Sequence, residues 1–271
     1  MRAVLICPSE RPHVRFLAET QPLALAPVLG QSLVEYWLSC LACTGFQEVL
    51  LLASDRHEQL QEAIGTGARW GLAVAVREQP QELTPLEARS RYCEQPEGAA
   101  GQEWLTVMDH LPGFAQFPLF TSYQGWFSAL NVWMPEAITP DRVGVREIQP
   151  SVWAGTRSRI SSSAELRPPC WLGQSVSIGP RTRVGPGAIL EDGALIEEDV
   201  QITDSFVGPR TFVGRYSQIK DSIAWGDTLI NWKTDSIAKV PDAFLLCALR
   251  SPARRRGGGL FRHLAGLCSQ H

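Results

Sequence analysis

The sequence predicts an α/β domain followed by a parallel β-helix. Two observations support this fold class. Short apolar runs alternate with amphipathic segments over residues 1–80, a pattern typical of strands alternating with helices. From Ile160 onward the periodicity changes, and an aliphatic residue recurs every six positions. A fixed short period is the sequence signature of a repeat architecture, and six residues is the step of a hexapeptide β-helix.

The repeat is continuous apart from one deleted residue after Ile202. Its aliphatic positions are Ile160, Leu166, Leu172, Ile178, Val184, Leu190, Ile196, Ile202, Val207, Val213 and Ile219. The residue two positions earlier is small or β-branched, as at Ala164 and Thr182. We expect each aliphatic residue to fill the interior of the helix. Glycine directly follows several of them, as at Gly173 and Gly179, and we interpret it as supplying turn dihedrals that a Cβ atom would oppose.

The elements of the first domain follow from periodicity and end signals. The predicted strands are 2–7, 48–53, 72–76 and 103–109, and the predicted helices are 32–44 and a segment from Asp55 through Ile64. Gly45 is placed to end the first helix. Asp55 and Glu58 resemble a capping box at the start of the second. We expect residues 80–101 to be irregular, and the aromatic stretch 114–133 to pack against the sheet or the first turn of the β-helix.

These patterns divide the chain into four segments. They are an α/β domain at 1–134, a linker at 135–150, the hexapeptide β-helix at 151–227, and a C-terminal extension with a basic and apolar tail at 228–271. We expect neighbouring subunits or terminal segments to cover the open end of the β-helix, because an exposed coil presents unpaired strands. The tail segment Leu260–Leu267 is one candidate for that role.

Composition narrows the function classes. The 271 residues carry a formal net charge of −3, which gives no general attraction to nucleic acid or to an anionic membrane. The N-terminus does not read as a signal peptide, and no run is long enough for stable membrane insertion. Seven cysteines without regular spacing indicate reduced thiols and a cytoplasmic location. The only lysines are Lys220, Lys233 and Lys239, so lysine chemistry is excluded upstream of them.

Particular strings resemble the sugar-phosphate nucleotidyltransferases. Residues 26–30, Ala-Pro-Val-Leu-Gly, precede a predicted helix as in that family's motif PLLPVxGKP, and residues 65–74 resemble its GDGSRWGVxV stretch. Residues 105–109 end in Asp109 where the family has a strand ending in Gly-Asp, and residues 222–225 are similar to its NSVIW motif. The resemblance implies a truncated Rossmann-like nucleotidyltransferase domain and a left-handed β-helix. It covers residues 1–80 and 150–227 well and the middle poorly.

Departures from the family motifs fall on its functional positions. The family's Gly-rich phosphate loop is replaced by residues 7–13, Cys-Pro-Ser-Glu-Arg-Pro-His, which contain no glycine and two prolines without an N–H donor. Leu23 stands where the family has a phosphate-binding lysine. The base-contacting segment has become residues 83–89, Leu-Thr-Pro-Leu-Glu-Ala-Arg. Most of the sugar-binding half, including the second metal-binding aspartate, is missing.

We therefore expect a catalytically degenerate nucleotidyltransferase-like protein, without a catalytic residue or cofactor. It would act as a scaffold, regulatory subunit or ligand sensor in sugar-nucleotide or cell-envelope metabolism. Its expected partners are copies of itself or another protein, and a nucleotide or sugar nucleotide is a possible ligand. The nucleotide, the sugar, the order of self-association and the role of the Arg-rich tail stay open.

Two enzymatic alternatives remain open from the sequence. A divergent nucleotidyltransferase would join a nucleoside triphosphate to a sugar 1-phosphate and release pyrophosphate, using Asp109 as a weak Mg²⁺ candidate and Arg11 or Arg15 at the phosphates. A hexapeptide acyltransferase would need a histidine in the β-helix as general base. The histidines are His13, His57, His110, His263 and His271, and none of them lies in the repeat, which disfavours this second alternative.

Overall fold

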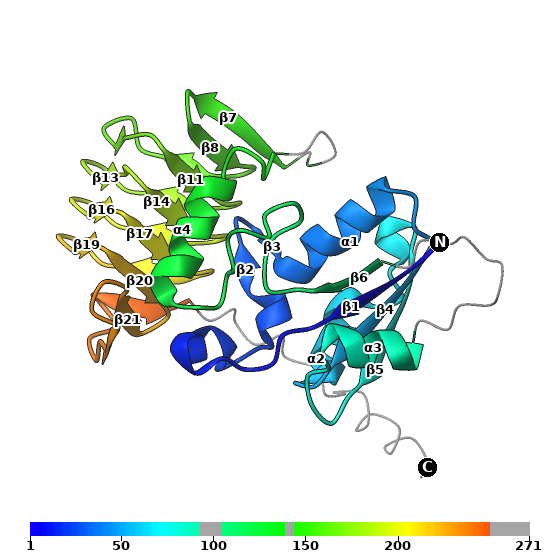
Figure 1. The fold of residues 1–271 in the computed structure, drawn as a ribbon. Helices are drawn as coiled ribbons and strands as arrows, with labels where there is room; N and C mark the ends of the chain where they lie inside the picture. Colours follow the sequence, from blue (N-terminus) through cyan, green and yellow to red (C-terminus); the bar gives the residue numbers. More distant parts are fainter. Residues whose placement is uncertain (93–103, 139–141, 143, 250–271) are drawn as a thin grey trace, which may run out of the picture.

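A computed structural model describes residues 1–92, 104–138, 142 and 144–249. The N-terminal part is a four-stranded parallel sheet with helices on both faces (Figure 1). In spatial order its strands are β5 (Ala73–Glu78), β4 (Glu48–Ala53), β1 (Arg2–Ile6) and β6 (Trp104–Val107). The chain passes from β1 to β4 and β5 on one side and then returns to place β6 on the other side of β1. The predicted strands near the N-terminus and at 48–53, 72–76 and 103–109 are confirmed.

Alternate residues of the central strands face two separate cores. Val4 and Ile6 of β1 pack with Leu83 and Ala88 beneath helix α3 (Pro85–Tyr92). Ala3, Leu5 and the corresponding residues of β4 join the larger core on the opposite face, together with α1 (Leu33–Cys43) and α2 (His57–Ile64). Because both faces are covered, the central strands are apolar and buried at every position after their first, exposed residue, and this explains why the sequence indicates them.

Helix ends account for the differences from the predicted elements. Gly45 has φ +84°, and the N–H of Phe46 donates to the carbonyl of Leu41, so α1 ends as predicted. The capping box predicted at α2 is wrong, because both Asp55 oxygens accept hydrogen bonds from the neighbouring Arg56 side chain, at 2.7 and 2.6 Å. A bidentate guanidinium is a stronger partner for a carboxylate than a backbone N–H.

Residues 80–101, predicted to be irregular, contain α3. Its start is a reciprocal capping box that was overlooked in the sequence: the Thr84 N–H donates to Glu87 at 2.9 Å, and the Glu87 N–H donates to Thr84 Oγ1 at 3.3 Å. Pro85 occupies the first helical position, where a missing N–H costs nothing. Residues 93–103 lie outside the described residues.

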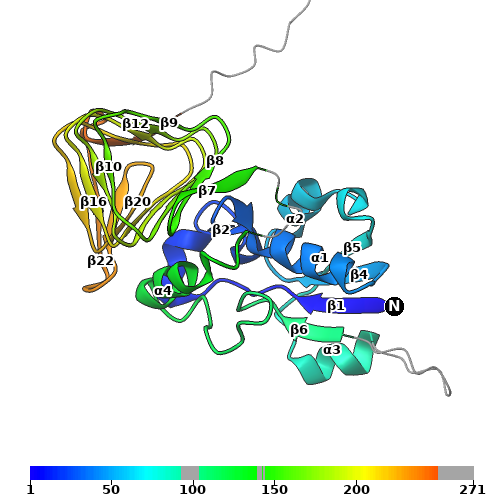
Figure 2. The ribbon, with the colours of Figure 1, turned by 90° about the horizontal axis from the view of Figure 1, so that it is seen from above.

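The C-terminal part consists of parallel and mixed strands in an arrangement compatible with a β-helix. Seen from above, three sheets enclose a triangular cross-section (Figure 2). The eight-stranded sheet has the order β22 (Ser236–Lys239), β21 (Thr228–Asn231), β20 (Ser222–Trp225), β17 (Ser205–Val207), β14 (Ala188–Leu190), β11 (Cys170–Leu172), β8 (Val152–Gly155) and β7 (Val145–Gln149). The five-stranded sheet has the order β23 (Leu246–Ala248), β18 (Thr211–Val213), β15 (Leu195–Ile196), β12 (Ser177–Ile178) and β9 (Arg159–Ile160). The four-stranded sheet has the order β10 (Glu165–Leu166), β13 (Arg183–Val184), β16 (Gln201–Thr203) and β19 (Gln218–Lys220).

The aliphatic repeat positions line the interior of this triangle. All of them are buried except Ile160 and Leu166 of the first strands, which are partly buried. One strand from each sheet forms a coil, and aligned residues such as Ile178 and Ile196 are 18 positions apart. Across the deletion, Ile202 aligns with Ile219, 17 positions on. The deletion shortens the corner after Ile202, so the flanking strands keep their register.

The glycines of the repeat have two causes, of which only one was predicted. Gly185 follows Val184 and has φ +95°, as the prediction of turn dihedrals requires. Gly173 and Gly179 do not have positive φ; a Cβ on either would lie 2.7 Å from a backbone atom of the next coil. Close approach of successive coils therefore excludes a side chain there. Positive φ also occurs at non-glycine residues of the repeat, such as Arg181 (54°), Asp199 (57°) and Tyr216 (61°).

Antiparallel strands extend individual sheets at both ends of the repeat. Strand β7 lies in the segment predicted as a linker and pairs with β8. At the other end β21 and β22 extend the eight-stranded sheet, and β23 pairs with β18 and places buried Leu246 in the interior. The tail from residue 250, including Leu260–Leu267, lies outside the described residues.

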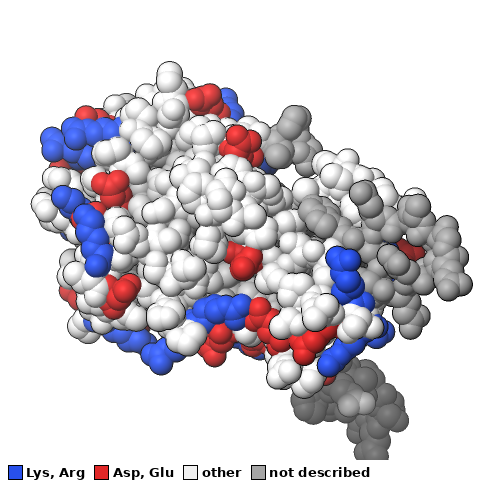
Figure 3. Space-filling view, in the orientation of Figure 1, with Lys and Arg blue, Asp and Glu red and all other residues white. Residues whose placement is uncertain are grey.

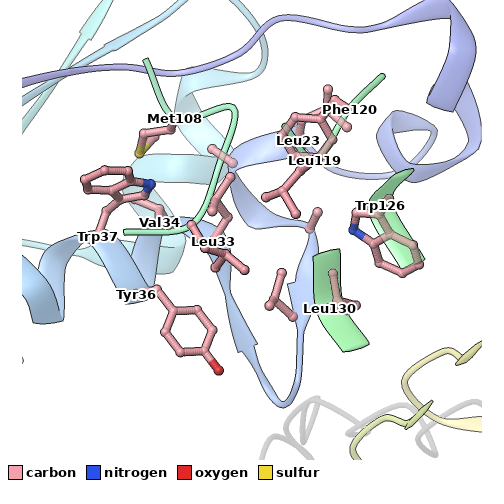
Figure 4. Packing of buried hydrophobic residues seen from close by; sticks show 14 of the residues in the cluster. Leu23, Leu33, Val34, Tyr36, Trp37, Met108, Leu119, Phe120, Trp126 and Leu130 are labelled. Carbon is pink, nitrogen blue, oxygen red and sulfur yellow. The ribbon is translucent and has the colours of Figure 1, made fainter. Parts of the chain in front are cut away.

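The two parts share one hydrophobic core. The central residues of strands β8, β11, β14, β17 and β20 point outward from the triangle, and these are Trp153, Trp171, Ile189, Phe206 and Ile223. They join the core of the α/β part, where α4 (Tyr123–Trp133) packs against them and the ring centroids of Trp126 and Phe206 are 4.6 Å apart. Figure 4 shows Trp126 and Leu130 of α4 facing the same core as Leu33 and Val34 of α1. The aromatic stretch was predicted to pack on the sheet or on the first coil. It packs in the core of the α/β part and contacts several coils.

Replacing Phe206 by alanine tests this shared core. We expect the Phe206→Ala variant to lose about 3–5 kcal/mol of unfolding free energy, because a fully buried ring is removed from tight packing. Phe212→Ala is the matched control, since Phe212 faces outward on β18 and is only partly buried. Urea denaturation of both variants gives the comparison, and equal losses would contradict a core shared through Phe206.

Candidate functional site

The carboxyl ends of β1 and β6 form the candidate site. In open α/β sheets, ligands bind where the strand order reverses, which here lies between these two strands. Residues 7–11 follow β1, and Met108, Asp109 and His110 follow β6. The connection between β5 and α3 also reaches this edge, and brings Glu82 against the segment that follows β1.

Glu82 is held by four donors from two residues of this segment. Its Oε2 accepts the Ser9 N–H at 2.9 Å, the Ser9 hydroxyl at 2.6 Å and Arg11 Nη1 at 2.7 Å, while its Oε1 accepts Arg11 Nη2 at 2.7 Å. Burial opposes ionisation of Glu82, but the hydrogen bonds from Arg11 and Ser9 outweigh it and lower its pKa to about 2. The carboxylate is therefore ionised at neutral pH and satisfied within the protein.

The other predicted site residues are Asp109, which lies near the pair formed by Glu82 and Arg11, and Arg15, which does not. Asp109 is near enough to Arg11 to help raise the pKa of its guanidinium, after the larger effect of the Glu82 hydrogen bond. The Asp109 carboxylate contacts His110 Nδ1 at 2.6 Å, and the His110 ring stands edge-on to Trp37. Arg15 lies elsewhere, in a cleft with Thr228 and Lys239. Arg11 and Asp109 thus lie at the same edge of the sheet, within electrostatic reach of each other, whereas Arg15 lies apart.

Two residues stand at positions where sugar-phosphate nucleotidyltransferases bind phosphate, and neither is suited to that role. Leu23, at the place of the family lysine, is fully buried in the main core. Cys7 is buried directly after β1, and burial, reinforced by Glu82, raises the pKa of its thiol, so it is a poor nucleophile. Within the described ranges no group of three or more His, Cys, Asp or Glu side chains is arranged to hold a metal ion. The described residues around Asp109 therefore lack the carboxylate cluster that would fit a resident metal ion.

A second polar cluster joins the two parts of the chain. The hairpin of β2 (Pro27–Val28) and β3 (Gln31–Ser32) turns at Leu29 and Gly30, both with positive φ, and the Gly30 N–H donates to Glu191 at 2.8 Å. Glu191 is 1% exposed, and its Oε1 has no hydrogen-bond partner. Burial, with repulsion from Asp192, raises its pKa to about 8 against the attraction of Arg142 and the Leu29 and Gly30 hydrogen bonds.

Arg142 completes this junction. It donates to the Leu29 carbonyl and, at 2.7 Å, to the Tyr36 hydroxyl, and its guanidinium lies 4.9 Å from the centre of the Trp171 ring. Sequence reasoning missed Glu191, because nothing around it in the repeat distinguishes it from a solvated corner. The apolar residues at 153, 171 and 189 were a usable signal, since their spacing of 18 equals one coil.

Comparisons with known proteins agree with the α/β part of the fold. No protein-family model matches the chain. Over 80 residues the chain is 28% identical to N-acetylmuramate alpha-1-phosphate uridylyltransferase of Neisseria meningitidis serogroup B (strain ATCC BAA-335 / MC58), a match covering 30% of this chain and 35% of that protein. The chain thus matches about a third of that relative's length. This weak homology to a nucleotidyltransferase, with a parallel sheet compatible with that fold, supports nucleotidyltransferase-like descent. None of the helices in the described ranges is long and apolar enough to span a bilayer.

Glu191 predicts a pH dependence of stability. Its pKa is raised in the folded protein, so the unfolded chain releases this proton at lower pH and the free energy of unfolding falls between about pH 4.5 and 8. Glu191→Gln removes that loss. We expect the free energy of unfolding of the variant to be higher than that of the wild type by about 2–4 kcal/mol at pH 8 and equal to it near pH 4. Urea denaturation across this range, with the exposed Glu62→Gln as control, provides the measurement. An unchanged pH slope in Glu191→Gln would contradict the assignment.

Proposed function

We propose that this chain is a catalytically degenerate relative of sugar-phosphate nucleotidyltransferases, acting as a scaffold, regulatory subunit or ligand sensor in sugar-nucleotide or cell-envelope metabolism. The proposal includes a truncated Rossmann-like nucleotidyltransferase domain, a left-handed β-helix and assembly with copies of itself or another protein. The observation that carries the proposal is the set of hydrogen bonds that Glu82 accepts. The donors that follow β1, where the family binds triphosphate, are already engaged by a carboxylate of the same chain.

Three further features support loss of transfer chemistry. Residues 7–13 contain no glycine, so backbone amides have less freedom to surround a phosphate chain. Leu23 is buried where the family places a cation. Among the described residues between Asp109 and β7, the buried side chains of α4 pack in the main core. Little room is left for the sugar-binding half that the family carries there.

The surface offers support for a protein contact. Residues 111–135, which include α4, contain no charged side chain. In the view of Figure 3, charged residues gather mainly toward the margins, while the central area over α4 carries few. Phe117 and Val132 of this segment are 36% and 45% exposed. Depletion of charge with some exposed apolar side chains is typical of interface cores.

The alternative is a divergent nucleotidyltransferase, and Asp109 favours it: this carboxylate is 45% exposed at the switch point, and its charge acts on Arg11. Its chemistry would still require a phosphate to displace Glu82.

Turnover assays separate the two. We assay pyrophosphate release from each of the four nucleoside triphosphates in the presence of sugar 1-phosphates and Mg²⁺. We expect the wild-type chain to release none, like the Asp109→Ala variant. Melting temperatures with the same ligands show whether binding survives, because a ligand of the folded state raises them by mass action. Wild-type turnover that Asp109→Ala abolishes would establish the enzyme instead.

A further inference from the structure

The donors around Glu82 form an anion-binding set. A backbone N–H, a hydroxyl and both arms of a guanidinium converge on one carboxylate, with contacts of 2.6–2.9 Å. Arg11 Nη1 also donates to Ser9 Oγ at 2.8 Å, which orders the two residues relative to each other. Charged forks combined with amide and hydroxyl donors are the usual protein partners of phosphate as well as of carboxylate.

The pair is placed where an external ligand can compete. Glu82 and Arg11 retain 21% and 31% side-chain exposure, so solvent reaches both. Glu82 also belongs to a connection rather than to β1 or its loop. Two residues later Thr84 caps α3, so withdrawal of Glu82 would move the start of that helix.

We propose that Ser9 and Arg11 form a binding site for the terminal phosphate of a small molecule, and that Glu82 is an internal plug that occupies this site until phosphate displaces it. The proposal deepens, and rests on, the ligand-sensing role proposed above. Displacement of Glu82 would couple phosphate binding to the position of α3. A change in that helix could be sensed by a partner without any catalysis.

Phosphate is favoured over a carboxylate ligand by its charge and its acceptor oxygens. A phosphate monoester carries up to two negative charges near neutral pH and a third acceptor oxygen, whereas a free carboxylate only repeats the chemistry of Glu82. Every external ligand must compete with Glu82, which is held at a high effective concentration, so the greater charge of phosphate gives it the advantage. Asp109 adds negative charge near Arg11, so we expect wild-type affinity to be weak, with a dissociation constant on the order of millimolar.

The test uses the full chain in phosphate-free buffer, with inorganic phosphate and acetate as probes. Glu82→Gln removes the charge of the plug and keeps its shape. We expect this variant to melt at a lower temperature than the wild type, to regain stability on adding phosphate, and to bind phosphate by calorimetry at least about tenfold more tightly. Acetate should produce neither effect.

Two matched variants complete the design. Glu78→Gln alters a carboxylate at the end of β5 that is 71% exposed, and should behave as wild type. Arg11→Met combined with Glu82→Gln should lose the gained affinity. If Glu82→Gln does not fold, Glu82→Asp, whose carboxylate is drawn back by one methylene, should show the same order of affinities.

Equal phosphate affinity in the wild type and the plug variant would overturn the proposal. So would a gain that survives removal of Arg11, or an equal response to acetate. The binding result is independent of turnover, so pyrophosphate release by the wild type would defeat the proposed function while leaving the phosphate measurement to be judged by itself.

Discussion

The packing of one sheet face against α4 is the constraint on which the rest of the structure depends. Every coil contributes one outward apolar residue to this face, and the column from Trp153 to Ile223 becomes part of the α/β core. The strands that carry it are thereby buried on both sides, one facing the triangular interior and the other facing α4. Without this contact, large aromatic and aliphatic side chains would be left in water, at a cost of about 1.5–3 kcal/mol each. The two architectures therefore form a single body.

The same contact explains the buried polar cluster at its margin. Joining the two parts brings the β2–β3 turn against the corner at Glu191, where the Gly30 N–H requires an acceptor. Glu191 satisfies that donor but is itself cut off from water, and its second oxygen remains without a partner. Such groups often lower stability while restricting how surfaces fit together. We infer that Glu191 orients the turn on the β-helix-like part.

The carboxyl edge of the sheet follows a related logic. An Arg and a free amide at the end of β1 need a negative partner, and the chain supplies Glu82. The proposed phosphate site follows from this arrangement, in which the donors stay together while a carboxylate of the same chain occupies them. The weak similarity to a uridylyltransferase spans about a third of that enzyme, which agrees with shared descent. The function of this chain has to be argued from the residues of its own site.

The sequence by itself determined the features that depend on local pattern. The central strands, the end of α1 at Gly45 and the period of six were readable because burial and turn geometry act on neighbouring positions. It did not determine the partners of Asp55, the strand at 145–149 or the reason for Gly173, since each depends on a group distant in space or on a competing neighbour. Glu82 and Arg11 are 71 positions apart, and Gly30 and Glu191 are 161 apart. Only the tertiary structure decided those pairings, because a partly buried donor selects its acceptor by proximity and not by sequence spacing.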